Sequence, residues 1–140
     1  MNEANVIQEM LFGEGAGTPR SLAVIGLSDR PDRPSHYVSA YMQAQGYTVY
    51  PVNPALERVL GERSYGSLAE LPLKPDVVNV FRLPSFIPAI VDEMLELGLA
   101  NLWVQQGIVH REAAARAEAG GIRVVMDRCI MVEHRSLRGF

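Results

Sequence analysis

The chain has 140 residues and a mass of 15.4 kDa, which fits one compact domain of ordinary size. Hydrophobic residues make up 48% and charged residues 21%, which excludes a disordered or fibrous protein. The net charge of −3 argues against general electrostatic capture of nucleic acid or of an anionic membrane, and leaves room for a local basic site that holds one anionic ligand.

The first predicted element is a short amphipathic helix over residues 3–12, because its apolar residues recur at helical spacing. A glycine-rich breaker at 13–17 follows it, so we expect residues 1–17 to form an arm outside a core at 20–135. The apolar run 22–26 predicts a strand buried on both faces and ended by glycine. The next helix is predicted to begin at Ser35, an N-cap residue, and to stop at Gly46.

Further strands and helices alternate along the rest of the chain. Residues 47–52 predict a strand rich in β-branched and aromatic side chains, and 62–65 and 67–71 predict a short edge strand and a short helix. A buried strand at 76–81 precedes a helix capped by Ser85, with Pro88 in its first turn, that extends to Leu97. Strands at 102–104 and 122–125 flank an alanine-rich helix at 111–119, and the segment after them is expected to be a terminal loop.

This alternation predicts the fold class. Crossovers of a dozen or more residues bring each strand back parallel to a neighbour. We therefore expect a single α/β domain with a doubly wound, mainly parallel sheet of five or six strands and helices on both faces.

The segment 26–35, after the first strand, has the residues of an anion cradle. In such sheets ligands bind beyond the carboxyl ends of the strands, where the strand order reverses. Gly26 permits close approach to the backbone, Ser28 offers a hydroxyl, and Arg30 or Arg33 can meet a phosphate through a planar guanidinium. The free N–H groups at the start of the following helix favour the same charge. A solvated turn is the alternative interpretation.

The same loop disfavours a nicotinamide dinucleotide. The glycine fingerprint of such sites would need glycine at positions 28 and 31, where Ser28 and Pro31 stand. The acidic residue expected near the end of the second strand is also missing, since that strand ends in Val52 and Asn53.

Five segments together resemble a known family: 26–28 with 33–35, 52–54, 80–84, 105–107 and 127–134. The resemblance is to the stand-alone CoA-binding domain proteins, small bacterial and archaeal relatives of the N-terminal domain of the succinyl-CoA synthetase alpha subunit. It covers roughly residues 20–135. It implies a Rossmann-like, nucleotide-binding fold that holds coenzyme A across the carboxyl edge of the sheet.

The resemblance also implies roles for particular residues. The loop residues would meet the pyrophosphate, the end of the second strand and the segment from Phe81 would flank the nucleotide, and the pantetheine arm would run toward Gln105. The predicted cofactor-binding residues are Gly26, Leu27, Ser28, Arg30, Arg33, Ser35, Val52, Asn53, Pro54, Phe81, Arg82, Leu83, Gln105, Gln106 and Gly107. The synthetase's second domain, which carries a phosphorylated histidine, has no room here, so ligase activity is not expected.

The histidines have structural interpretations. His110 is expected to start a helix, and His36 is expected to be solvent-exposed. Two interpretations of His134 are open: the neighbouring Glu133 tunes its pKa, or the imidazole makes a structural hydrogen bond. No complete catalytic or metal-binding set can be assembled, so we expect neither an enzyme nor a metal site.

The lone cysteine, Cys129, cannot form an internal disulfide, which favours a reducing, cytoplasmic compartment. The chain also lacks a long apolar run and a signal-peptide pattern at its start, so no membrane association is expected. Cys129 is a possible partner for the CoA thiol in a mixed disulfide, and a buried small hydrophobe is the alternative.

The sequence therefore predicts a non-catalytic carrier, sensor or subunit that binds coenzyme A or an acyl-CoA, with a protein partner possible. One alternative is a subunit of an acyl-CoA or nucleotide-dependent transferase whose catalytic parts lie on another chain. The other is a regulatory protein that responds to ADP-like nucleotides.

Overall fold

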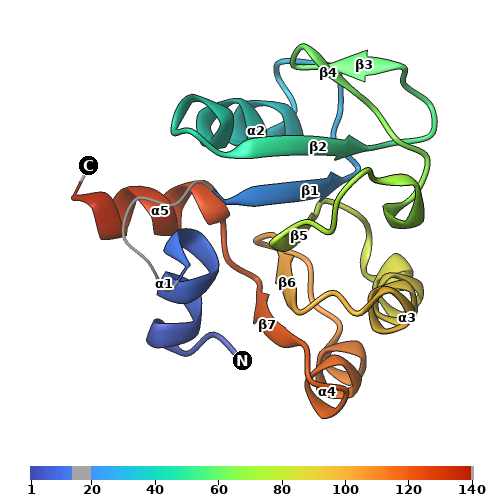
Figure 1. The fold of residues 1–140 in the computed structure, drawn as a ribbon. Coiled ribbons are helices and arrows are strands. Elements are labelled where there is room, and N and C mark those ends of the chain that lie inside the picture. Colours follow the sequence, from blue (N-terminus) through green and yellow to red (C-terminus); the bar gives the residue numbers. More distant parts are fainter. Residues whose placement is uncertain (14–19, 140) are drawn as a thin grey trace.

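The computed structural model describes residues 1–13 and 20–139, in which strands and helices alternate (Figure 1). The main elements are α1 (Ala4–Phe12), β1 (Ser21–Ile25), α2 (Pro34–Ala44), β2 (Thr48–Val52), β5 (Val77–Val80), α3 (Ile87–Leu97), β6 (Asn101–Val104), α4 (Arg111–Ala119), β7 (Arg123–Met126) and α5 (Ile130–Arg138). The minor elements are β3 (Arg58–Val59), β4 (Glu62–Arg63) and two 3₁₀ turns, η1 (Leu68–Glu70) and η2 (Pro84–Phe86).

The sheet in this part of the chain is parallel, with five strands in the order β2-β1-β5-β6-β7. β3 and β4 form a separate antiparallel hairpin. The four residues of β5 and the four of β6 are all buried, because each strand is covered by helices on both faces. The predicted doubly wound α/β fold is confirmed.

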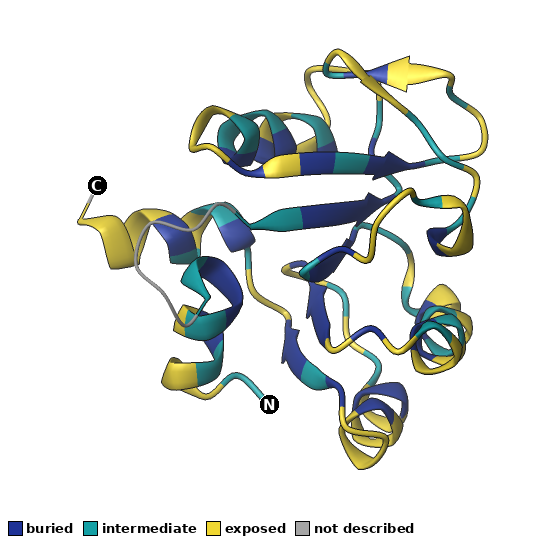
Figure 2. Cartoon of the chain, viewed as in Figure 1, coloured by how far each residue is buried: buried dark blue, intermediate teal, exposed yellow. Residues whose placement is uncertain are grey.

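Alternate residues of the strands supply two hydrophobic layers. Figure 2 shows that most of the central strands are buried, whereas the helices have exposed residues as well. Ala23 of β1 and its neighbours on that face pack with α3 and α4, whereas Val24 belongs to the layer under α1, α2 and α5. Figure 1 shows α3 and α4 on one side of the sheet and α1 and α5 on the other. Helices therefore cover both faces of the sheet, and a polar binding site is expected at the strand ends.

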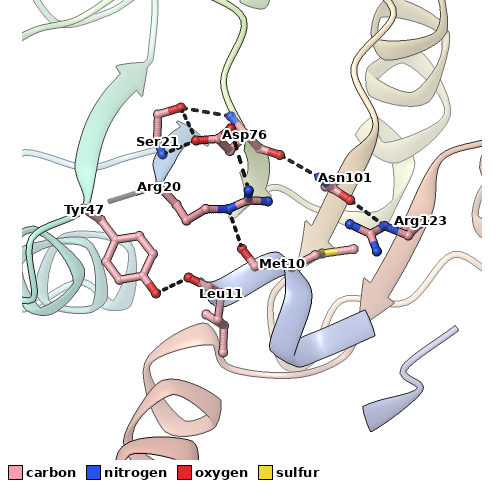
Figure 3. Close-up of polar contacts among 8 residues, drawn as sticks. All are labelled: Met10, Leu11, Arg20, Ser21, Tyr47, Asp76, Asn101 and Arg123. Carbon is pink, nitrogen blue, oxygen red and sulfur yellow. Dashed lines mark hydrogen bonds and ion pairs between the residues drawn. The ribbon is translucent and has the colours of Figure 1, made fainter. Parts of the chain in front are cut away.

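The predicted N-terminal helix is part of the core, since Met10 and Leu11 are each only 1% exposed. Arg20 fastens its end, because its Nε donates to the carbonyl of Met10 while its guanidinium forms an ion pair with Asp76 (Figure 3). Asp76 in turn accepts hydrogen bonds from the backbone and hydroxyl of Ser21. These contacts tie α1 to the amino ends of β1 and β5. The predicted breaker at 13–17 lies, except for Gly13, outside the described residues.

Two predicted caps are wrong. α2 has Arg33 at its N-cap and Pro34 in its first turn, so Ser35 lies inside the helix. α3 follows the turn η2 and has Phe86 at its N-cap, so Ser85 does not cap it, although Pro88 does stand in its first turn as predicted.

The expected terminal loop is also wrong, because residues 130–138 form α5. Ile130 is fully buried and His134 is 2% exposed, so this helix closes the layer shared by α1 and α2. Its sequence carries no capping side chain at Cys129, which removes the usual signal for a helix start.

Candidate functional site

The order in which strands are added to the sheet reverses between β1 and β5. From β1 the chain passes through α2 to β2 on one side, and it then returns to β5 on the other side of β1. Loops that leave the carboxyl ends of β1 and β5 therefore diverge and leave a crevice between them, as is general for doubly wound sheets. The loop 26–33 and the segment that begins at Phe81 form this crevice.

Gly26 allows the two loops to approach. Its φ is +86°, and a Cβ built on it would lie 2.4 Å from the carbonyl oxygen of Phe81 and 3.0 Å from Cδ of Arg82. Any other residue would clash with that backbone oxygen and adopt an unfavourable conformation. The function of Gly26 visible in the structure is thus to bring the start of the loop against Phe81 and Arg82.

The loop after Gly26 is held by its own serines. The Ser35 hydroxyl accepts a hydrogen bond from the N–H of Ser28 at 2.9 Å, and the Ser28 hydroxyl accepts one from the N–H of Arg30 at 3.1 Å. The N–H of Arg33 donates to the Arg30 carbonyl, which closes a turn before α2. Ser35 is buried. It therefore shapes the loop rather than capping the helix.

A cavity of about 1040 Å³ opens beside this loop. Twelve of the residues singled out from the sequence line it: Gly26, Ser28, Arg30, Arg33, Ser35, Phe81, Arg82, Leu83, Gln105, Gln106, Gly107 and Cys129. The charged side chains among all its lining residues are three arginines, with no carboxylate. In a chain with a net charge of −3, this cavity is a concentrated positive site.

The three arginines differ in their contacts. The Arg82 guanidinium stacks over the ring of Phe86, with 3.8 Å from its central carbon to the ring centroid. Arg30 lies 3.6 Å from the Asp32 carboxylate, but both side chains are more than 60% exposed, so solvent weakens that pair. Arg33 is exposed at the start of α2. Arg30 and Arg33 stand on one bank of the crevice, and Arg82 stands on the other.

The far wall of the cavity is built by Gln105 and by residues that follow β7, among them Cys129. Gln105 is 4% exposed, and its side-chain oxygen accepts the N–H of Ile130, the first residue of α5. The Asp127 carboxylate accepts the N–H of Gly107 at 2.7 Å, and Asp127 itself has a φ of +62°. Trp103 donates its indole N–H to the carbonyl of Arg128. The segment 127–130 is therefore fixed from three sides, and Cys129 with it.

Four residues predicted as nucleotide contacts do not line this cavity: Leu27, Val52, Asn53 and Pro54. The Leu27 side chain is fully buried beneath α2, and Val52 is 5% exposed in the opposite layer. The Asn53 amide donates to the carbonyl of Leu27, which joins the end of β2 to the loop after β1. Val52 also accepts the N–H of Gly26, so Leu27, Val52 and Asn53 support the loop from behind, whereas Pro54 is exposed.

The histidines take structural positions. The His110 imidazole Nδ1 accepts the N–H of Ala113 and so caps α4, as predicted. His134 lies among aromatic rings, 2.8 Å from the Tyr41 hydroxyl, and burial and the charge of Arg138 lower its pKa. Its predicted structural hydrogen bond is confirmed. Burial raises the pKa of the nearby Tyr47 to about 12.

Sequence reasoning missed several apolar residues of the cavity: Tyr37, Phe86, Ile108, Met131 and Val132. The last two belong to α5, the helix that was not predicted. Tyr37 is one residue before the buried Val38 on α2, and helical periodicity alone does not show that it faces a cavity.

A second hollow of about 450 Å³ lies at the amino ends of the strands, and it has a different charge balance. Its arginines are paired: Arg123 forms an ion pair with Glu9, and Arg20 lies 3.9 Å from Asp76. Figure 3 shows the contact between Arg20 and Asp76 together with the hydrogen bond from Arg123 to Asn101. Two carboxylates line this hollow beside its arginines and Lys74, whereas no carboxylate lines the cavity beside β1, so that cavity is the stronger candidate for an anion.

Within residues 1–13 and 20–139, no cluster of three or more histidine, cysteine, aspartate or glutamate side chains is arranged to hold a metal ion. None of the described helices is both long and apolar enough to cross a membrane.

The chain is similar in sequence and fold to known proteins. Residues 20–135 match the family model described as "CoA binding domain". The "Uncharacterized protein YneT" of Bacillus subtilis is 45% identical over 115 residues, which are 82% of this chain and 85% of that protein. A solved structure from Thermus thermophilus, titled "The structure of cell-free ID.343", has a TM-score of 0.86 and 37% identity, and the match covers 96% of this chain and 98% of that one.

A longer relative is the "Acetate--CoA ligase [ADP-forming] II subunit alpha" of Pyrococcus furiosus, 29% identical over 132 residues. The match covers 85% of this chain but only 29% of that subunit. The chain thus corresponds to one part of the ligase subunit.

Proposed function

The chain belongs to the family of CoA-binding domain proteins, and we propose that it binds coenzyme A or an acyl-CoA in the cavity between β1 and β5. The observation that carries this proposal is the set of three arginines, without a carboxylate, at the switch point of the sheet. Coenzyme A carries a diphosphate and a separate ribose phosphate, so it offers anions to both banks of the crevice. Arginine recognises such groups through paired N–H donors.

We assign Arg30 and Arg33 to one phosphate group and Arg82 to another, because they stand on opposite banks. The N–H groups in the first turn of α2 add partial positive charge beside Arg33. The pantetheine arm would then lie along Gln105, Gln106 and Gly107, the far wall of the same cavity. This places the thiol end of the ligand beside Cys129.

We further propose that the chain is a binding module rather than an enzyme by itself. The polar and charged side chains that line the cavity belong to arginine, serine, tyrosine, glutamine and cysteine, without an aspartate, glutamate, histidine or lysine to serve as a ready general base. Any chemistry on the thioester would need groups from another chain. That the chain matches one part of a ligase subunit favours a role inside, or beside, a larger assembly.

The test is a pair of variants in a binding assay. Arg33→Ala removes a guanidinium from the cavity, whereas Arg58→Ala removes one from the exposed β3–β4 hairpin. Both change the net charge by the same amount. Arg33→Ala is expected to weaken CoA binding by about 1.5–3 kcal/mol, the scale of a hydrogen bond to a charged group, while Arg58→Ala leaves it unchanged. Equal losses in both variants would show a general charge effect and refute the assigned contact.

A thermal-shift series separates this function from its alternatives. CoA at a hundredfold excess over its dissociation constant stabilises the fold by about 2.7 kcal/mol. We expect clear stabilisation by CoA and acetyl-CoA, less by ADP, and none by NAD or NADP. Equal stabilisation by CoA and ADP would support a nucleotide-responsive regulator instead.

A further inference from the structure

The cavity is divided into a charged half and an uncharged half. All three arginines belong to the loop 26–33 or to the segment after β5. The opposite wall consists of the Gln105–Ile108 segment and the first turn of α5, and its lining side chains carry no charge. A ligand that is anionic along its whole length would use only the first half.

Several apolar side chains are exposed in the uncharged half of the cavity and along its rim. Val132 of α5 is 52% exposed, Leu83 69% and Phe86 42%, and all three line the cavity. Ile108 and Met131 line it as well and are half-buried. These side chains come from three separate parts of the chain and meet at one opening. An apolar patch gathered at a pocket is typical of a binding surface.

The position of this patch identifies the part of the ligand that would cover it. If the phosphates lie at the arginines and the pantetheine lies along Gln105–Gly107, the thiol end points to Cys129, Met131 and Val132. Any acyl group on that sulfur would then extend among apolar side chains. A hydrocarbon chain gains free energy there, whereas a terminal carboxylate would lose its hydration among lining side chains that carry no positive charge.

We propose that the ligand of this chain is an acyl-CoA whose acyl group is a hydrocarbon chain, and that Val132 and its apolar neighbours hold that chain. The proposal rests on the proposed function, because it takes the phosphate and pantetheine positions from it. The acyl group, rather than CoA alone, completes the burial of the rim.

The experiment measures dissociation constants for CoA, acetyl-CoA, butyryl-CoA, hexanoyl-CoA and succinyl-CoA with the full chain. Each fully buried methylene contributes about 0.8 kcal/mol, a factor of about four in affinity, so we expect at least a twofold gain per methylene from acetyl to hexanoyl. Succinyl-CoA, with a carboxylate at its end, is expected to bind more weakly than butyryl-CoA.

A matched pair of variants locates the effect. Val132 and Leu137 are both exposed apolar residues of α5, but only Val132 lines the cavity. Val132→Ser is expected to abolish most of the dependence on acyl length, whereas Leu137→Ser is expected to change neither this dependence nor the affinity for CoA.

Different results would overturn the hydrocarbon proposal and the proposed CoA binding. If CoA binds with one affinity whatever the acyl length, or if succinyl-CoA binds best, the hydrocarbon proposal is overturned and the CoA site stands. If neither CoA nor any thioester binds, the proposed function itself is wrong. A length dependence that persists in Val132→Ser, or one that disappears in Leu137→Ser, would also overturn the assigned position.

Discussion

The substitution Gly26→Ala tests whether the close approach of the β1 and β5 loops forms the site. The new methyl group would lie 2.4 Å from the Phe81 carbonyl oxygen, and the residue would have to keep a φ of +86°. The unfavourable backbone conformation costs about 1–2 kcal/mol, and the forced overlap adds about 1–3 kcal/mol. The expected loss of unfolding free energy is therefore about 2–5 kcal/mol.

Gly121→Ala is the matched control for this prediction. Gly121 has a φ of +90°, and nothing lies within 4 Å of the position of its Cβ. It therefore bears the backbone cost without the overlap, and it is expected to lose only about 1–2 kcal/mol. Urea denaturation of both variants measures the difference. If Gly26→Ala is no less stable than Gly121→Ala, the contact between the two loops does not limit residue 26, and the reasoning is refuted.

Three further predictions concern single side chains. His134 is buried and its pKa is lowered, so the unfolded chain takes up a proton more readily than the folded chain as the pH falls below about 6.5, and the folded state loses stability. His134→Gln should therefore reduce the fall in unfolding free energy, measured by urea denaturation, between about pH 7 and pH 5.5. Parallel plots of unfolding free energy against pH for the variant and the wild type would contradict this. Asn79 is 1% exposed and neither polar atom of its side chain has a hydrogen-bond partner. Asn79→Leu should therefore raise the unfolding free energy, measured by urea denaturation, by about 1–3 kcal/mol. A fall in the unfolding free energy of similar size would contradict this. The Cys129 thiolate should attack CoA disulfide, forming a protein–CoA disulfide and releasing one CoA thiolate, and intact mass should show the adduct on wild type but not on Cys129→Ser.

The parallel sheet could be predicted because its signals are local. Each central strand is a short apolar run, and the glycines and prolines that end the runs stand beside them in the sequence. The loop 26–35 could likewise be found, since the carboxyl end of the first strand is fixed once the strand is known. What the pattern could not show is how loops from different strands meet, such as the contact of Gly26 with Phe81.

α5 could not be predicted because its start is held by a distant residue. The N–H of Ile130 donates to the side chain of Gln105, 25 positions earlier, and this long-range bond replaces a local cap. The apolar wall of the cavity was missed with that helix. Ser35 was mistaken for a cap for a related reason, because its hydroxyl accepts a bond from Ser28 instead of from its own helix.

The central claim is that CoA occupies the cavity between β1 and β5. An NMR titration of the ¹⁵N-labelled protein with CoA tests it most directly, because each backbone amide reports its own surroundings. The account predicts saturable shifts at Gly26, Ser28 and Gly107 that are weakened in Arg33→Ala. The absence of shifts, or shifts confined to the hollow around Lys74 and Arg123 at the opposite end of the sheet, would contradict it.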